Sequence, residues 1–178
     1  MKRILSPRML PLALLALVCA LVLPVSGIAA EAAAGANRAG VIGANDRPIH
    51  DAARLGTGKD VEAILKADPA MRDARTQHGS TPLHLAATNP DIGALKALLA
   101  AGAQVNVRDN EGLTPLHMTA YTQNARHAEL LLQAGADPYA KTNAGRDPTS
   151  LARKTRSDEV SGVISLWILK GCKAGQPC

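Results

Sequence analysis

The feature that most constrains this chain is a tetrapeptide, Thr-Pro-Leu-His, which occurs at residues 81–84 and again at residues 114–117. A period of about 33 residues is typical of a solenoid, in which each unit packs on its neighbours. Prolines at positions 48, 82, 115 and 148 align four segments of nearly equal length with the same period. The sequence therefore predicts an array of about four units.

Each unit is expected to begin with a short helix. Proline is favourable in the first turn of a helix, where its missing N–H costs nothing. The residues before three of the prolines, Thr81, Thr114 and Asp147, carry the side-chain oxygen that an N-cap requires. Arg47 lacks this oxygen, which makes the first unit weaker unless Asp46 substitutes as the cap. The first helices are predicted at about residues 50–55, 83–87, 116–121 and 149–154.

A second helix is expected in each unit, because apolar residues then recur at helical spacing. Gly102 and Gly135 would end two of these helices in the left-handed conformation. In the second unit we expect Asn89 to cap the helix and Pro90 to start it. In the last unit Gly171 ends the helix, and we expect an insertion of about three residues in the loop before it. Polar links that contain glycine predict hairpin-like turns at 73–80, 106–113 and 139–146.

The residues around the tetrapeptide resemble the ankyrin repeat signature. The match runs from Gly79 to Ala87 and from Asn106 to His117, and Ala-Gly-Ala recurs at 101–103 and 134–136. The resemblance implies an all-α ankyrin-repeat solenoid of about four helix-turn-helix units linked by hairpin-like turns. Its degenerate first and last units would act as caps. The repeat domain is placed at 46–171, with units at about 46–79, 80–112, 113–145 and 146–171.

The resemblance also gives the tetrapeptide a structural role. In the family this histidine bonds backbone and links adjacent repeats, which is favoured here over a metal or catalytic role. His50 is expected to be a third copy, whereas His78 and His127 are expected to face solvent. The structural motif residues are Thr81, Pro82, His84, Thr114, Pro115 and His117.

Members of the family bind protein partners through the turn tips and the exposed face of the first helices, and the resemblance implies the same here. Tyr121 and Leu113 are the expected anchors, because tyrosine is favoured at binding hot spots and Leu113 is an apolar residue at a tip. A merely solvated face is the alternative. The predicted partner-binding residues are Gln77, His78, Ser80, Thr88, Asn89, Asn110, Glu111, Leu113, Tyr121, Thr122, Asn143, Ala144 and Arg146.

The segment at 1–30 predicts a cleavable signal peptide. Three cations precede an apolar run from Met9 to Leu23, and small residues lead to a cleavage site after Ala30. The run is shorter than the roughly 20 residues that a membrane-spanning helix needs, which favours cleavage over a permanent anchor. Residues 31–45 are expected to form a flexible leader. The mature chain is therefore expected in the bacterial periplasm or outside the cell.

Two cysteines remain after removal of the signal peptide, Cys172 and Cys178. An even count in an oxidising compartment favours a disulfide, which would close the tail at 172–178. A free pair and a metal site are the alternatives. Two thiols without a neighbouring histidine make a poor zinc site.

The motifs of enzymes are missing from the sequence. There is no Gly-x-Ser-x-Gly, no His-Glu-x-x-His and no phosphate-binding loop. We therefore predict no catalysis and no cofactor. The chain has only three aromatic residues, so stacking on nucleic acid is not expected. The basic run at 153–156 fits an acidic partner or a phospholipid head group, but a solvated cap face is favoured.

The sequence thus predicts a non-catalytic protein–protein interaction module that is monomeric when alone. It would inhibit, shield or position an envelope enzyme, as an immunity protein or as a protective companion. One alternative is a membrane-tethered scaffold with an uncleaved signal, in which the membrane is also a partner. A hydrolase or redox enzyme is a more remote alternative.

Overall fold

The computed structural model describes residues 46–175 of the 178-residue chain. The predicted signal peptide at 1–30, the leader at 31–45 and Cys178 lie outside the described residues, so these assignments stay predictions. Within residues 46–175, no helix is long and apolar enough to cross a membrane.

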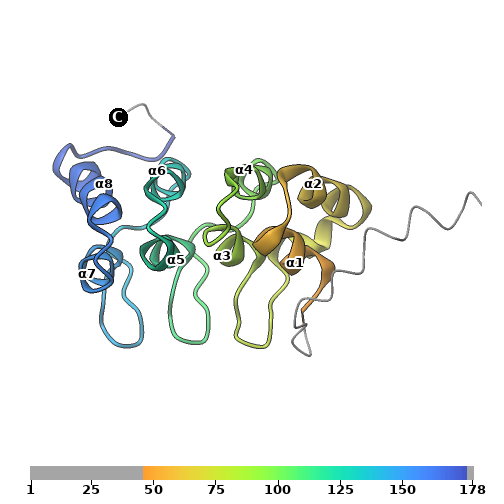
Figure 1. Cartoon of the computed structure of the whole chain (residues 1–178), viewed down its shortest axis with the longest axis horizontal. Helices are drawn as coiled ribbons and strands as arrows, with labels where there is room; N and C mark the ends of the chain where they lie inside the picture. Colours follow the sequence, from red (N-terminus) through yellow and green to blue (C-terminus); the bar gives the residue numbers. More distant parts are fainter. Residues whose placement is uncertain (1–45, 176–178) are drawn as a thin grey trace, which may run out of the picture. The chain divides into compact units, whose positions relative to one another are not determined.

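Four pairs of α-helices make up most of the described region, which contains no β-strand (Figure 1). A 3-10 helix after the second α-helix, η2 (Pro69–Asp73), was not predicted. The first helices of the pairs are α1 (Pro48–Leu55), α3 (Pro82–Ala86), α5 (Pro115–Thr122) and α7 (Pro148–Lys154). The second helices are α2 (Gly58–Ala67), α4 (Ile92–Ala100), α6 (Ala125–Gln133) and α8 (Asp158–Leu169).

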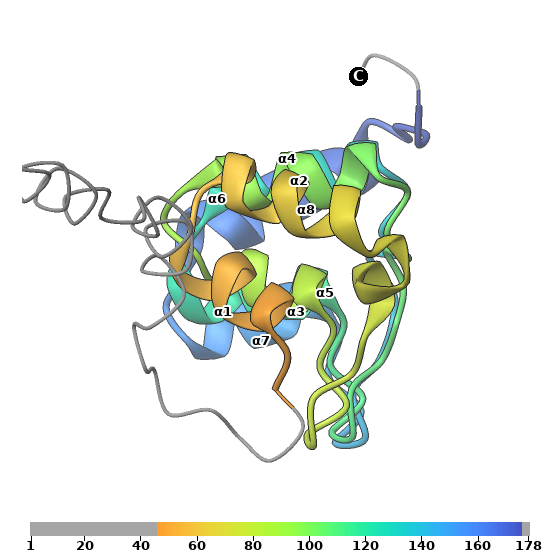
Figure 2. The ribbon, with the colours of Figure 1, turned by 90° about the vertical axis from the view of Figure 1, so that its right-hand side faces the viewer.

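The helices of the repeat array form two layers, shown from the side in Figure 1 and along the array in Figure 2. The inner helices α1, α3, α5 and α7 pack on one another in that order, and the outer layer pairs α2 with α4 and α6 with α8. Three hairpin-like loops, which we call the fingers, project from the inner layer and superpose in the view along the array (Figure 2). The fingers turn at Thr76–Ser80, Asp109–Leu113 and Thr142–Arg146.

Each inner helix begins at its proline, as predicted, with Arg47, Thr81, Thr114 or Asp147 at the N-cap. The Asp147 carboxylate accepts a hydrogen bond from the backbone N–H of Ser150 at 2.8 Å, which is the expected cap. The hydroxyl of Thr81 instead lies 2.9 Å from Nδ1 of His84, and Thr114 bonds its histidine in the same way. Each threonine thus forms a capping box with its histidine, whose Nδ1 also accepts from the threonine backbone N–H.

The three histidines of the inner helices are fully buried and connect successive parts of the array. The backbone N–H of Thr81 donates to Nδ1 of His84 at 3.1 Å. Since a backbone amide can only donate, Nε2 carries the proton and donates to the carbonyl oxygen of Leu113 at 3.0 Å. His117 bonds Thr114 and Arg146 equivalently. His50 bonds Arg47 and, in place of a finger residue, Ala74.

The start of α4 corrects one prediction. Asp91, not Asn89, is the N-cap, and Pro90 lies before the helix. Asn89 has its amide turned into the preceding unit, where it donates to the carbonyl oxygens of Ala53 and Gly56. With this correction the N-caps of the second helices recur with the same spacing as the prolines. These N-caps are Thr57, Asp91, Asn124 and Ser157.

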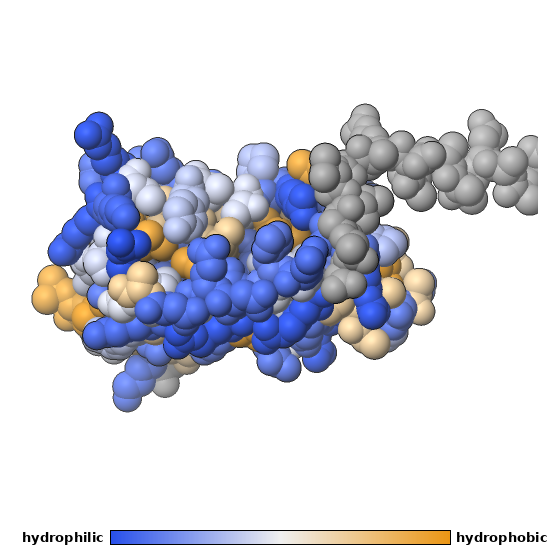
Figure 3. Space-filling view, turned by 90° about the horizontal axis from the view of Figure 1, so that it is seen from below, coloured by the Kyte–Doolittle hydropathy of each residue, from blue (hydrophilic) through white to orange (hydrophobic). Residues whose placement is uncertain are grey.

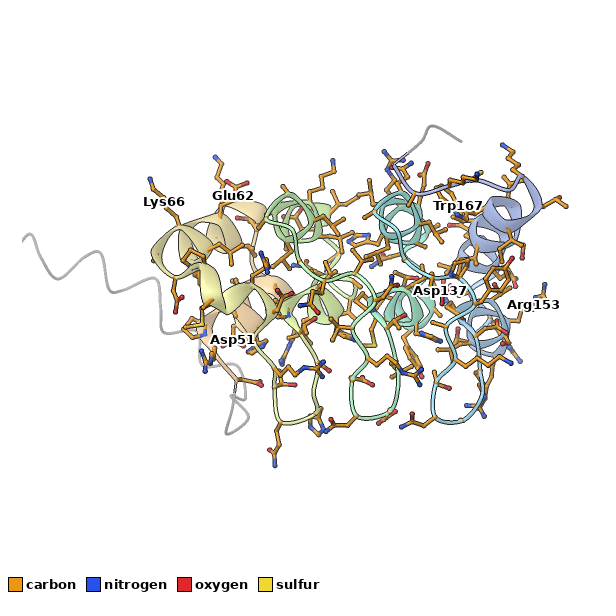
Figure 4. The ribbon with its side chains drawn as sticks, turned by 180° about the vertical axis from the view of Figure 1, so that it is seen from behind. Asp51, Glu62, Lys66, Asp137, Arg153 and Trp167 are labelled. Carbon is orange, nitrogen blue, oxygen red and sulfur yellow. The ribbon has the colours of Figure 1, made fainter. Side chains whose placement is uncertain are left out.

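The predicted insertion before the last helix is therefore also wrong. Helix α8 begins in register, and its length is 12 residues where α4 and α6 have 9. The additional residues extend the C-terminal end of the helix and delay its stop at Gly171, which has φ 64°. Trp167, in this longer helix, is 8% exposed and lies on the side of α8 that faces the array (Figure 4).

The core is continuous from the first unit to the last and consists mainly of leucine, alanine, isoleucine and valine. Leu83 and Leu116 occupy the same position in successive inner helices and are fully buried. Small alanines such as Ala86 and Ala120 let the inner helices approach closely. A core of this composition needs few aromatic residues, in agreement with the sequence.

The fingers are held in register by backbone hydrogen bonds between neighbours. The N–H of Asn110 donates to the carbonyl oxygen of His78 at 3.0 Å, and Asn143 repeats this bond to Glu111 at 2.9 Å. Each finger contains a glycine with positive φ, as Gly112 does at 77°. A Cβ on Gly112 would lie 2.5 Å from Oδ1 of Asn143, so both the conformation and the space require glycine.

Candidate functional site

A surface pocket of about 300 Å³ lies where the second and third fingers meet the inner helices α5 and α7. Most of its lining residues are among the predicted partner-binding residues. We call it the finger pocket. Its lining residues are Asn110, Glu111, Leu113, Tyr121, Thr142, Asn143, Ala144, Arg146 and Leu151.

Tyr121 is the largest exposed group of the finger pocket. It lies in the last turn of α5, and its side chain is 51% exposed. Leu113 and Leu151 supply the apolar part of the lining and are 8% and 3% exposed. The pocket therefore offers an aromatic side chain beside a small apolar floor, which is a common arrangement at the energetic centre of a protein interface.

The walls of the pocket come from two asparagines that also join the fingers. The amide of Asn110 donates to the carbonyl oxygen of Gln77 at 3.1 Å, and that of Asn143 donates to the carbonyl oxygen of Asn110 at 2.9 Å. Because their amides are already hydrogen-bonded, the side chains of Asn110 and Asn143 are held in one conformation. The pocket is preformed, which reduces the entropy lost when a partner binds.

The structure changes the expected role of Leu113 and removes Asn89 from the exposed surface. Leu113 is not an exposed anchor at a tip, because its side chain joins the core and its carbonyl accepts from His84. Asn89 is 2% exposed, since its amide binds backbone of the preceding unit. His127 was expected to face solvent but is 3% exposed in α6. The position of a residue within its repeat does not show which residues of an adjacent unit pack against it.

The remaining predicted residues lie outside the pocket. Gln77 and His78 are exposed on the first finger, and Ser80 is half-buried behind them. Thr88 and Thr122 are half-buried, and their hydroxyls donate to backbone carbonyl oxygens at 2.7 and 3.4 Å. A partner that covers the finger pocket and the first finger would contact Gln77 and His78 as well.

Thr142 and Leu151 line the finger pocket but were not predicted. The repeat period could have found them, because Leu151 occupies in the fourth unit the position that Met118 occupies in the third. Thr142 is 9% exposed, and its hydroxyl accepts from the N–H of Arg146. It thereby stabilises the finger that carries Arg146.

The finger pocket contains one cation and one carboxylate, Arg146 and Glu111, both of which are exposed. Neither forms an ion pair within residues 46–175. Beneath the pocket, burial lowers the pKa of His84 and His117, although their hydrogen bonds to carbonyl oxygens oppose this. Both rings are therefore neutral at pH 7 and serve as bridges.

The exposed groups of the finger pocket suit contact with a partner. In the described part of the chain, no group of three or more histidine, cysteine or acidic side chains could hold a metal ion. The exposed groups around Tyr121 are amides, one guanidinium and one carboxylate, which can orient a partner through hydrogen bonds and charge.

A second hollow, of about 410 Å³, lies on the side of the fourth unit that no further unit of the described chain covers. Apolar side chains contribute to it, among them Tyr139 and Leu169, which are 64% and 83% exposed. Arg153 points outward at this end of the array (Figure 4). The last unit is thus a less polar cap than its basic run suggested.

A family model for ankyrin repeats in three copies matches residues 49–142. No curated protein shows significant similarity to the chain. The family match spans more than half of the sequence and includes the inner helices α1, α3 and α5 with their buried histidines. The paired helices, the fingers and the histidine bridges are what such repeats produce, and the chain belongs to the ankyrin repeat family.

Proposed function

We propose that this protein is a non-catalytic binding module of the bacterial periplasm, which holds a partner protein against the finger pocket. Ankyrin repeats are a protein–protein interaction module, which supports a protein partner. The finger pocket supports one specific surface as the place where this partner binds. Its strongest feature is Tyr121, which lies half-exposed beside Leu151 between rigid fingers. By binding there, the module would inhibit, shield or position an envelope enzyme, as an immunity protein or as a protective companion.

Rigidity supports this assignment. The fingers are joined by backbone and side-chain hydrogen bonds, and buried histidines join α3 and α5 to the ends of the next fingers. Such a frame loses little entropy on binding. The surface residues beside the frame, among them Tyr121 and Arg146, are then free to select the partner.

The test is capture of a partner from an envelope extract with the mature chain as bait. Tyr121→Ala should weaken binding of the captured protein by about 30-fold, which corresponds to the roughly 2 kcal/mol of a hot spot. Tyr139→Ala is the matched control, because Tyr139 is similarly exposed but lies outside the finger pocket. Equal effects of the two substitutions would rule out the finger pocket as the binding surface.

Two further measurements address location and the tail. Sequencing the N-terminus of the mature protein should find a start near Glu31, whereas retention of residues 1–30 would support a membrane-tethered scaffold. Alkylation of the unfolded protein before and after reduction should find Cys172 and Cys178 protected only before reduction.

A further inference from the structure

A line of cations runs across the three fingers. The residue immediately before each finger is basic, namely Arg75, Arg108 and Lys141, which recur with the period of the repeat. All three are exposed, and so is Arg146 at the end of the third finger, inside the finger pocket. Viewed from the finger side, the array presents a predominantly hydrophilic surface (Figure 3).

Hydrogen bonds fix this line relative to the finger pocket. The guanidinium of Arg75 donates to the carbonyl oxygen of Arg108 at 3.0 Å, so the first cation lies against the second finger. The guanidinium of Arg108 lies 3.5 Å from Oδ1 of Asn143, which lines the pocket. Arg108 therefore borders the pocket, and Arg146 lines it.

No carboxylate of the described residues forms an ion pair with these four cations. The ion pairs found within residues 46–175 involve other arginines: Arg54, Arg72 and Arg126. The fingers contain two carboxylates, the exposed Glu111 and the half-buried Asp109, whose Oδ1 accepts from the backbone N–H groups of Glu111 and Leu113. Asp109 keeps its negative charge, but the four cations still outnumber these two carboxylates. The excess positive charge attracts an acidic surface.

We propose that the partner presents an acidic segment that carries one bulky apolar side chain, an inference that rests on the protein-binding function proposed above. The apolar side chain enters the finger pocket between Tyr121 and Leu151. Carboxylates beside it pair with Arg146 and with the line of cations at Arg108 and Lys141. Exposed charge pairs of this kind contribute mainly to the association rate and to partner choice, and they weaken with salt.

The probe is a short fluorescein-labelled peptide with a central tryptophan flanked by aspartate and glutamate. It is compared with the same peptide carrying serine and glutamine instead, and with vesicles of anionic phospholipid. By fluorescence anisotropy at low salt, the acidic peptide should bind the mature chain about tenfold more tightly than the neutral one. Raising the salt to about 0.5 M should remove most of this difference.

Charge reversal then locates the effect. Lys141→Glu combined with Arg146→Glu removes no side-chain hydrogen bond within the described residues, and it should weaken the acidic peptide about tenfold. Lys59→Glu combined with Lys96→Glu is the matched control, because it makes the same charge change at exposed sites on α2 and α4. The control should bind within about twofold of the unmodified chain.

The outcomes separate the two proposals. If the neutral peptide binds as tightly as the acidic one and Tyr121→Ala abolishes both, the finger pocket binds protein but the acidic partner is wrong. If Tyr121→Ala changes neither, the pocket itself is wrong and the proposed function falls with it. Binding to anionic vesicles that depends on Lys141 and Arg146, without peptide binding, would replace the acidic segment by a membrane surface.

Discussion

The third and fourth units contain the same proline-started inner helix but differ at the third helical residue. His117 in the third unit is fully buried and joins Thr114 to Arg146 of the next finger. Ser150 in the fourth unit is exposed, and its hydroxyl and N–H bond only Asp147 in its own N-cap. In the third unit the histidine bonds the finger that follows, and in the fourth unit no such bond is made within the described residues. The motif therefore serves the contact between units, and residues that bind a partner have to be sought beside it.

Removal of the histidine bridge in the third unit should have the largest effect on the free energy of unfolding. His117→Ala leaves a cavity and deprives the Thr114 N–H and the Arg146 carbonyl of their partners, so we expect a loss of about 3–4 kcal/mol in the free energy of unfolding. Ser150→Ala in the fourth unit should cost at most about 1 kcal/mol. Urea unfolding followed by the fluorescence of Trp167 measures both.

The difference in stability between His117→Ala and Ser150→Ala tests whether the histidine joins the units. Equal losses would mean that His117 contributes no more than a local cap and that the units are held by apolar packing alone. A retained m-value is needed as the control, because a change would indicate that the units of the variant unfold separately.

Acid should weaken the inner units selectively. In the unfolded chain a histidine titrates near pH 6.5, and burial lowers the pKa of His84 and His117 in the folded chain. Both states are neutral above pH 6.5, so stability is constant there. Below pH 6.5 the histidines of the unfolded chain bind protons, whereas those of the folded chain stay neutral. The free energy of unfolding therefore falls until the pH reaches the lower pKa of the folded chain. We expect a loss of up to about 1.4 kcal/mol per pH unit for each histidine in that window.

Urea midpoints at pH 7.5, 6.5 and 5.5 measure this loss. His78→Gln is the control, because His78 is exposed on the first finger and should leave the slope unchanged. Burial also lowers the pKa of His127, which adds to the slope in the same direction. A midpoint that does not fall between pH 6.5 and 5.5 would contradict the neutral, buried bridges.

The smallest expected effect comes from the two residues with positive φ that follow α5 and α7, where the third and fourth units should respond alike. Gln123 follows α5 with φ 59°, and Arg156 follows the C-cap of α7 with φ 57°. Side chains rarely adopt this conformation, so glycine at either position should raise the free energy of unfolding by about 0.5–1 kcal/mol. Thermal unfolding should shift upward by about 2–4 °C for each substitution.

Lys154→Gly serves as the reference, because Lys154 is an exposed residue in the last turn of α7 and does not have positive φ. That substitution should destabilise by about 0.5–1 kcal/mol. If Gln123→Gly stabilised and Arg156→Gly did not, contacts of Arg156 in the fourth unit would outweigh its backbone strain.

Much of the fold could be predicted from local signals. Prolines at helix starts, glycines at helix ends and leucines at helical spacing are written into each unit, and α5 begins at Pro115 as expected. The start of α4 could not be predicted in this way. Asn89 looks like an N-cap in sequence, but its amide finds two carbonyl oxygens in the preceding unit, Ala53 and Gly56. Only stacking brings these groups together.

The candidate site was predicted in part. Repeat position correctly placed residues such as Asn143 and Arg146 on the fingers and Tyr121 on the inner helix, and the structure brings them into one pocket. It failed for Leu113, because exposure at a finger depends on how closely the finger packs on the inner helix, and this residue joins the core.

The sequence by itself determined the period, the helix pairs and the family, because these follow from residues that recur at a constant interval along the chain. The tertiary structure decided which side chains remain accessible. A buried bridge such as His84 and an exposed anchor such as Tyr121 differ in what the neighbouring unit places against them. That information lies in the contact between units, and no single unit contains it.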